Sequence, residues 1–271
     1  MKFKGLIKKD RKFKLMNGIY FFQEPHDNYW DSVYSKGVKG NFQKSEKDLI
    51  QFVRFALHNK KACENYFPII KLFNQKVKSA IEIGSGTGTF SLVLKKMGLV
   101  DKVFLVEKSK KALYTSKKMF EYFNEEATYI YADALDLPFR KNIFDVSISG
   151  GMIEHFKGDE LKKIILEQYR VARYPIFQFP TTSMMYWLQR GIITLVNGKW
   201  PFGYEVPLSK NKFISFLPKD SHFNKNYHDF LTAFLFRLKL KIRITPIIIN
   251  KNWINKLLLT DLVIGLIKKN E

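Results

Sequence analysis

The sequence predicts an α/β fold built on a doubly wound, mostly parallel sheet. Two observations predict it. Strand-like and helix-like segments alternate from Val77 onwards, and the first clear strand ends in the glycine-rich turn 84–88. Alternating strands and helices pack as a parallel sheet with helices on both faces. Right-handed crossover connections then make the sheet doubly wound.

The elements of this region follow from their apolar patterns. Short apolar runs predict strands, and longer segments with apolar residues along one side predict amphipathic helices. The expected strands cover 78–83, 102–106, 127–131, 144–149 and 174–179. The expected helices between them cover 90–97, 109–123 and 159–171.

The segment before this region is aromatic and basic, and we expect residues 1–62 to form an N-terminal arm and lid helices. Residues 1–14 hold seven Lys or Arg and one Asp, which favours a loose arm. The segment 29–40 is rich in turn-forming residues, whereas 45–62 has the apolar spacing of an amphipathic helix. A second helical stretch near 63–74 opens the main domain, residues 63–271.

After Pro180 the regular alternation stops, and we expect 181–250 to elaborate the substrate side of the domain. The patterns predict a helix over 181–196, a loop over 198–207 and a helix over 209–217. Residues 238–244 alternate apolar and basic side chains, as in a strand with one solvent-exposed face. Residues 262–267 fit either a strand or the end of an amphipathic helix.

The charge and the cysteine content limit the class of protein. The net charge of +21 attracts phosphates or an anionic membrane surface, but the lysines are spread along the chain, so a compositional bias with a solvated surface is the favoured explanation over a functional basic surface. The single cysteine, Cys63, excludes an internal disulfide and a multi-cysteine zinc site, and fits a cytoplasmic protein. No run reaches the roughly 18 apolar residues that span a bilayer. We therefore expect a cytoplasmic protein, at most peripheral to a membrane, and no metal site.

The turn through Gly84, Gly86 and Gly88 is the first sign of a binding site. Without Cβ atoms the backbone approaches a ligand closely, and the following helix offers unpaired N–H groups. Residue 89 is threonine, so the G-x-G-x-x-G spacing of dinucleotide sites is absent. Glu107 and Asp133 each follow a successive strand, at the edge where open sheets bind ligands. A carboxylate there suits ribose hydroxyls or an adenine amino group.

Four motifs within 77–156 resemble those of the class I S-adenosylmethionine-dependent methyltransferases, in the small-molecule branch related to ubiquinone biosynthesis. Glu82–Gly88 is similar to the acidic, glycine-rich motif of the family, and Val106–Ser109 to the segment that binds the ribose. Ala132–Phe139 is similar to the segment that binds the adenine, and Phe144–Phe156 to the motif of the fourth strand. The resemblance implies a Rossmann-like, seven-stranded methyltransferase fold with S-adenosylmethionine as cofactor and S-adenosylhomocysteine as product. It covers about 80 residues well.

The resemblance also implies roles for individual residues. Glu107 would hold the ribose with Lys108 beside the adenine, and Asp133 and Ala134 would fix the adenine edge. Gly150 or Gly151 would border the methyl donor. The methionine moiety would lie over the glycine turn, formed by Glu82, Gly84, Ser85, Gly86 and Gly88.

The sequence says less about the residues that would bind the methyl acceptor. Methyl transfer by direct displacement needs a base only when the acceptor holds its proton, and His155 has the right pKa range. Glu154 would orient His155 or contact the acceptor, unless His155 merely packs under a helix. Tyr29 and Trp30 resemble residues that close over the ligand, although core packing fits them equally. Weaker candidates for the acceptor pocket are Tyr204, Glu205 and His228.

These observations favour an enzyme that methylates a small-molecule or lipid-like acceptor, with peripheral membrane contact as an option. An RNA or protein methyltransferase and an inactive S-adenosylmethionine-binding protein remain open. Nucleic acid is the less favoured partner, because the fourth strand is not followed by the Asp/Asn-Pro-Pro-Tyr/Phe clamp and Cys63 precedes the glycine turn. The sequence does not define the oligomeric state.

Overall fold

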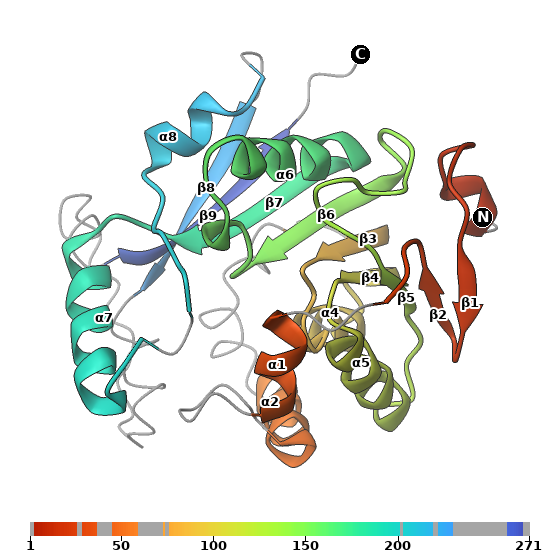
Figure 1. The fold of residues 1–271 in the computed structure, drawn as a ribbon, viewed down its shortest axis with the longest axis horizontal. Helices are drawn as coiled ribbons and strands as arrows, with labels where there is room; N and C mark the ends of the chain where they lie inside the picture. Colours follow the sequence, from red (N-terminus) through yellow and green to blue (C-terminus); the bar gives the residue numbers. More distant parts are fainter. Residues whose placement is uncertain are drawn as a thin grey trace.

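The computed structural model describes residues 3–25, 29–36, 45–58, 73, 76–200, 203–218, 222–229 and 259–267. Within these residues one mixed sheet of nine strands runs in the order β1-β2-β5-β4-β3-β6-β7-β9-β8 (Figure 1). The predicted α/β fold with a mostly parallel sheet is confirmed. The predicted count of seven strands is wrong for this chain, because β1 and β2 from the N-terminal segment extend the sheet beyond β5.

The centre of the sheet matches the predicted alternation closely. Five parallel strands are formed by β3 (Val77–Ile83), β4 (Val100–Glu107), β5 (Thr128–Tyr131), β6 (Phe144–Gly150) and β7 (Ala172–Pro180). The connecting helices are α4 (Thr89–Lys96), α5 (Lys110–Tyr122) and α6 (Gly158–Val171). The pairing of Glu107 with Tyr131 brings the carboxyl ends of β4 and β5 to the same edge.

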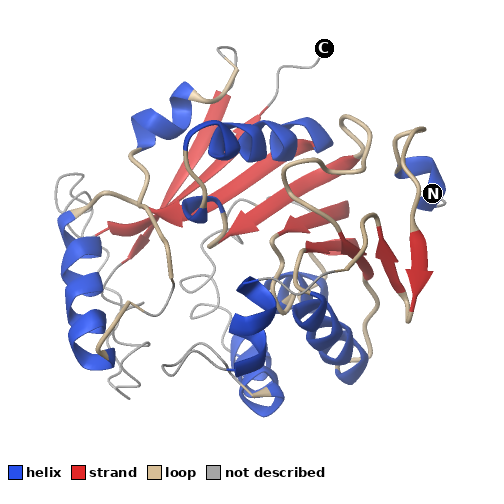
Figure 2. Ribbon diagram, in the orientation of Figure 1, coloured by secondary structure: helices blue, strands red, loops and turns tan. Residues whose placement is uncertain are grey.

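Alternate residues of these strands supply two separate cores. On β3, Ile81 packs with the core under α6, while its neighbour Ala80 packs with the core under α2, α4 and α5. Helices accordingly cover both faces of the sheet (Figure 2). Leu161 and Ile165 of α6 are almost fully buried on one face, as Leu92 of α4 is on the other.

The N-terminal segment is not a loose arm. A 3-10 helix, η1 (Phe3–Leu6), leads into β1 (Lys14–Met16), which pairs antiparallel with β2 (Ile19–Phe21), and β2 pairs parallel with β5. Both apolar ends of β2 are buried, so packing rather than charge decides the position of this segment. The turn Asn17-Gly18 has positive φ at both residues, which suits a tight hairpin.

The first two helices lie near the glycine turn. Residues 29–36 form helix α1 (Tyr29–Lys36), so the turn-rich interpretation of this segment is wrong. Buried Asp31 holds α1 in place, because its Oδ1 accepts hydrogen bonds from Ser109 Oγ at 2.8 Å and Lys111 N at 3.3 Å. Helix α2 (Glu46–His58) confirms the predicted amphipathic helix over the residues that the structure describes.

Beyond β7 the chain forms α7 (Met184–Asn197), α8 (Lys210–Ser215), β8 (His222–Asp229) and β9 (Leu259–Ile267). The alternatives at 262–267 are settled in favour of a strand, antiparallel to β7 and β8. The predicted helix near 63–74 and the strand 238–244 fall largely or wholly outside the described residues. In the described part of the chain, no helix has the length and apolar character needed to cross a membrane.

Candidate functional site

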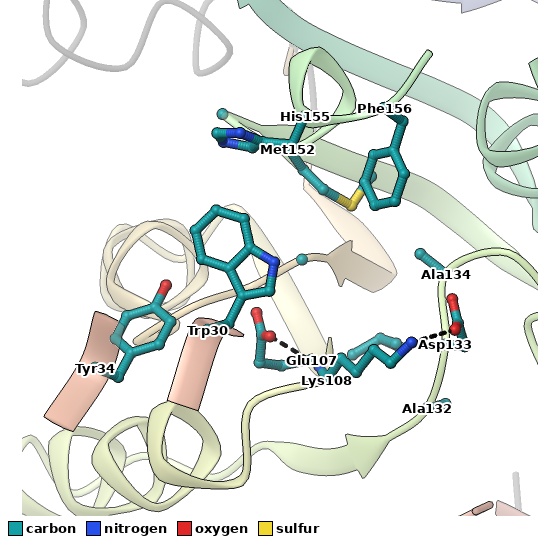
Figure 3. Close-up of a pocket in the computed structure, with 13 residues that line it drawn as sticks. Trp30, Tyr34, Glu107, Lys108, Ala132, Asp133, Ala134, Met152, His155 and Phe156 are labelled. Atoms are coloured by element: carbon teal, nitrogen blue, oxygen red, sulfur yellow. Dashed lines mark hydrogen bonds and ion pairs between the residues drawn. The ribbon is translucent and has the colours of Figure 1, made fainter. Parts of the chain in front are cut away.

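A pocket opens at the carboxyl edge of β3, β4, β5 and β6, with Trp30 and Tyr34 of helix α1 among its lining residues (Figure 3). Its empty volume of about 590 Å³ includes space that is open to solvent. The pocket is lined by Trp30, Tyr34, Gly84, Val106, Glu107, Lys108, Ala132, Asp133, Ala134, Gly151, Met152, His155 and Phe156. Most polar members of this set, Glu107, Lys108, Asp133 and His155, were predicted from the sequence.

Gly84 of the glycine turn lines the pocket, whereas Gly86 and Gly88 are not among its lining residues, and none of the three positions leaves room for a side chain. Gly84, Gly86 and Gly88 have φ values of +67°, +52° and +65°, in the left-handed region that favours glycine. A Cβ atom at Gly84 would lie 2.7 Å from Met152 Sδ, and one at Gly86 would lie 2.5 Å from the Tyr34 hydroxyl. Gly88 caps helix α4 at its N-terminus.

Glu107 ends β4 with its carboxylate held by three backbone N–H groups. Oε2 accepts a hydrogen bond from Gly86 N at 2.9 Å, and Oε1 accepts from Lys108 N at 2.7 Å and Ser109 N at 2.8 Å. Burial raises the pKa of this carboxyl, while the three hydrogen bonds favour its charged form and partly oppose the shift. The carboxylate is therefore fixed beside the glycine turn.

Asp133 follows β5 and pairs directly with Lys108 at one end of the pocket. Lys108 Nζ donates to Asp133 Oδ2 at 2.6 Å, and Leu135 N donates to Oδ1 at 2.9 Å (Figure 3). Ala134 lines the pocket beside them. Glu107, Lys108 and Asp133 thus form one polar end of the pocket.

Glu82 and Ser85 were predicted to contact the ligand, but neither is among the residues that line the pocket. Glu82 is buried, and its Oε2 accepts hydrogen bonds from the backbone N and the hydroxyl of Ser91 on α4. Burial raises the pKa of Glu82 to about 7. Ser85 Oγ is buried without a hydrogen-bond partner among the described residues.

Helix α1 and the segment after β6 close the pocket with apolar and aromatic side chains. Tyr34 lies one turn after Trp30, so both face the pocket from the same side of α1. Burial, together with the negative charges of Glu107 and Glu82, raises the pKa of the Tyr34 hydroxyl far above its usual range. The sequence interpretation missed Tyr34 and Met152, and recognising α1 as a helix would have revealed Tyr34.

His155 stands at the rim of the pocket. Its Nδ1 lies 2.5 Å from the backbone carbonyl oxygen of Tyr204, and its ring meets the Trp30 ring edge-on at 4.8 Å between centroids. Because a carbonyl oxygen only accepts, Nδ1 carries the proton and Nε2 can accept one. Burial lowers the pKa of the imidazole, and hydrogen bonds to the backbone of Tyr204 and Gly151 partly oppose this shift.

The other predicted residues of the acceptor side occupy different positions. Glu154 is buried, and a Cβ atom on Gly151 would lie 3.8 Å from its Oε1. Gly151 lines the pocket, whereas a Cβ atom on Gly150 would point at Gln178. Tyr204 is 54% exposed, and the side chain of His228 lies outside what the structure describes.

Glu205 is buried away from the pocket. Its carboxylate accepts hydrogen bonds from Tyr186 OH at 2.9 Å and Trp200 Nε1 at 3.3 Å. This carboxylate therefore holds the loop after α7 against that helix.

The donor set fits an adenosyl ligand. Two carboxylates follow neighbouring strands, and a glycine cradle that Cβ atoms would fill lies beside them. In the residues that the structure describes, no three His, Cys, Asp or Glu side chains gather as a metal site would require.

Comparison with known proteins agrees with this geometry. Residues 81–174 match the family model of a methyltransferase domain. No curated protein matches the sequence.

Solved structures with a similar fold include geranyl diphosphate C-methyltransferase from Streptomyces coelicolor A3(2), at 13% identity over 87% of this chain and 90% of that one, with a TM-score of 0.57. A second is magnesium protoporphyrin IX methyltransferase from Synechocystis PCC 6803, at 12% identity over 88% and 97%, with a TM-score of 0.51. The YcgJ protein from Bacillus subtilis is similar at 15% identity over 77% and 99%, with a TM-score of 0.51.

At these identities the structures show a shared fold, while the family match rests on the segment that carries the glycine turn, Glu107, Asp133 and His155. Residues 81–174 match a methyltransferase domain, and the described part of the chain shares its fold with methyltransferases of known structure.

Proposed function

We propose that this methyltransferase transfers the methyl group of S-adenosylmethionine to a small-molecule or lipid-like acceptor. The observation that carries the proposal is the polar end of the pocket. There Glu107 and Asp133 follow neighbouring parallel strands next to a glycine turn that excludes side chains. Ligands bind open α/β sheets at this edge.

Within this proposal Glu107 accepts hydrogen bonds from the ribose hydroxyls. Three backbone N–H groups already orient the carboxylate, and a carboxylate has about four acceptor sites. Asp133 accepts a hydrogen bond from the adenine amino group, with Lys108 beside it and Ala134 on the ring. Gly84, Gly86 and Gly88 provide the wall against the methionine moiety.

Glu82 and Ser85 act differently in the proposal. Glu82 is bonded to Ser91, so it shapes the turn between β3 and α4 rather than reaching the ligand itself. Ser85 Oγ is a candidate donor to the methionine carboxylate, because a buried hydroxyl without a partner is costly. Gly151 borders the methyl donor in preference to Gly150.

The sulfonium of S-adenosylmethionine supplies the electrophile, so the protein's task is to align the acceptor and exclude water. His155 removes the proton of an acceptor that holds one at neutral pH. The carbonyl of Tyr204 fixes the tautomer with Nδ1 protonated, which leaves the basic nitrogen at Nε2. The backbone oxygen of Glu154 accepts a hydrogen bond from Val206 N at 2.9 Å, which holds the chain at His155 against the segment that carries Tyr204.

Two experiments test the proposal. Calorimetry measures S-adenosylmethionine binding to the wild-type chain and to Asp133→Ala, with Asp101→Ala as control. Asp101 pairs with Lys76 near the amino end of β4, on an exposed surface. We expect Asp133→Ala to abolish binding and Asp101→Ala to bind like the wild type. Equal affinities in all three would refute the adenine contact.

The acceptor is identified by incubating cell extract with methyl-labelled S-adenosylmethionine and separating lipid, polymer and small-molecule fractions. Label in the lipid or small-molecule fraction supports the proposal. Label confined to RNA or protein would instead favour a macromolecular substrate, and tight binding without any transfer would favour an inactive binding protein.

A further inference from the structure

Helix α7 carries an exposed apolar face, which consists of Met184, Trp187, Leu188, Leu195 and Val196. These five side chains are between 51% and 84% exposed, with Leu195 the most exposed. At about 100° per residue, Met184, Leu188 and Leu195 share one strip of the helix, Trp187 flanks this strip, and Val196 lies further round the helix towards the anchored side. Among the described residues, no other helix leaves so many large apolar side chains exposed.

The opposite side of α7 is firmly anchored. Tyr186 and Gln189 are almost fully buried, and the Tyr186 hydroxyl donates to Glu205 Oε1 at 2.9 Å. Arg190 Nη1 donates to the backbone oxygen of Glu205 at 2.9 Å and to Tyr186 OH at 3.0 Å. The helix is thus held by its polar contacts, and it lies at one end of the molecule (Figure 1).

The charge around this face favours an anionic surface as the partner. From Thr181 to Pro218 the sequence has four basic residues: Arg190 on the anchored side of α7, Lys199 just after the helix, and Lys210 and Lys212 on α8. The one acid in this stretch, Glu205, is buried and hydrogen-bonded. A second copy of the chain would bring the same excess of 21 positive charges, which repels self-association. Anionic lipid headgroups neutralise the basic residues while the acyl region takes up the apolar side chains.

The side chains themselves suit the boundary between headgroups and acyl chains. The Arg190 guanidinium lies over the Trp187 ring, 5.6 Å from its centroid. Tryptophan is enriched at membrane interfaces, where an apolar ring and a polar atom meet different surroundings. An α7 of 14 residues is long enough to lie in this boundary, parallel to the membrane.

The anchored side of α7 connects directly to the acceptor side of the pocket. Glu205, which holds α7, stands between Tyr204 and Val206. The Tyr204 carbonyl bonds His155, and Val206 N donates to the Glu154 carbonyl. A membrane bound by α7 would therefore lie close to the rim at which the acceptor enters.

We propose that α7 docks the protein on an anionic membrane through its exposed apolar face, and that the acceptor is taken from that membrane. This inference rests on the proposed function and narrows its acceptor to a lipid-like molecule at the membrane surface.

The test is co-sedimentation of the full chain with vesicles of phosphatidylcholine alone and of phosphatidylcholine with phosphatidylglycerol. Three proteins are compared: the wild type, the double variant Leu188→Glu with Leu195→Glu, and the control Leu15→Glu. Leu15 is a 57% exposed leucine on β1, at the opposite side of the sheet from β9, the strand that contacts α7. We expect the wild type and the control to bind the anionic vesicles, and the double variant to bind roughly tenfold or more weakly, because two charges replace apolar contacts.

Several results would overturn the inference. These are absence of wild-type binding to anionic vesicles, equal binding by the double variant, and equal loss in the Leu15→Glu control. A wild-type dimer in sedimentation that the double variant breaks would identify a second copy as the partner instead. Calorimetry with S-adenosylmethionine on the same proteins separates the two proposals, since the α7 variants should keep the wild-type affinity. A wild type that binds vesicles but not S-adenosylmethionine would contradict only the proposed function.

Discussion

Gly88→Ala should destabilise the protein much more than Gly98→Ala, although both glycines have nearly the same backbone conformation. Their φ values are +65° and +72°, so alanine pays a similar left-handed penalty of roughly 1–2 kcal/mol at each position. The entropy that alanine removes from the unfolded chain is also similar at both positions. These contributions cancel when the two variants are compared.

The surroundings of the two glycines differ. A Cβ atom at Gly88 would lie 2.7 Å from Leu105 Cδ1 and 3.1 Å from Ser116 Oγ, and both side chains are buried. A Cβ atom at Gly98 would meet nothing within 4 Å. Overpacking a core costs about 1–3 kcal/mol, so the free energy of unfolding should be lower for Gly88→Ala than for Gly98→Ala by that amount.

Urea unfolding followed by circular dichroism measures this difference. For a domain of about this size, 1 kcal/mol corresponds to roughly 2–4 °C in Tm, so thermal melts provide a second readout. Equal stabilities for the two variants would refute the reasoning. They would mean that α4 shifts away from β4 easily and that the glycine turn is not closely packed.

Three further predictions concern the charged groups. Burial raises the pKa of Glu82 from 4.5 to about 7, so the stability that this group contributes is present below about pH 4.5 and is lost as the pH rises towards 7. Glu82→Gln should therefore gain stability relative to the wild type between pH 5 and pH 7.5 in urea titrations, and a constant difference would contradict this. Glu107→Gln should weaken S-adenosylmethionine binding in calorimetry about 10- to 100-fold, since a hydrogen bond to a charged group contributes about 1.5–3 kcal/mol. An unchanged Kd would exclude the contact between Glu107 and the ribose. His155→Asn should lower kcat about 10²- to 10⁴-fold, with unchanged affinity for S-adenosylmethionine. The kcat of the wild type should fall with decreasing pH only below 6.5, because burial lowers the pKa of His155. A variant as active as the wild type would exclude a base at this position.

The sequence predicted the central part of the fold well, because this part obeys local rules. The buried strand Val100–Glu107 contains the continuous apolar run 103–106, and helices such as Lys110–Tyr122 show clear periodicity. The segments that were missed depend on distant contacts. Strand β8 reads His-Phe-Asn-Lys-Asn-Tyr-His-Asp, a polar sequence that forms a strand through its pairing with β9. Strand β2 has only three residues and is defined by β5.

The candidate site was predicted to a similar extent. Glu107, Lys108 and Asp133 were found because each follows a strand, and strand ends meet at one edge. Tyr34 and Met152 were missed because their positions depend on how α1 and the segment after β6 fold over the pocket. The sequence also did not predict which way individual residues point. Glu82 accepts a hydrogen bond from Ser91, and Gly151 rather than Gly150 lines the pocket.

The pairing of β2 with β5 has a consequence for synthesis of the chain. Ile19 pairs with Tyr129, so the ribosome must add 129 − 19 = 110 residues before β2 meets its parallel partner β5. At about 5–20 residues per second, this strand waits roughly 5–20 s without that partner. The seven basic residues within 1–14 supply mutual repulsion during this interval. We therefore expect the basic segment 1–14 to protect the nascent chain from aggregation until β5 has been made.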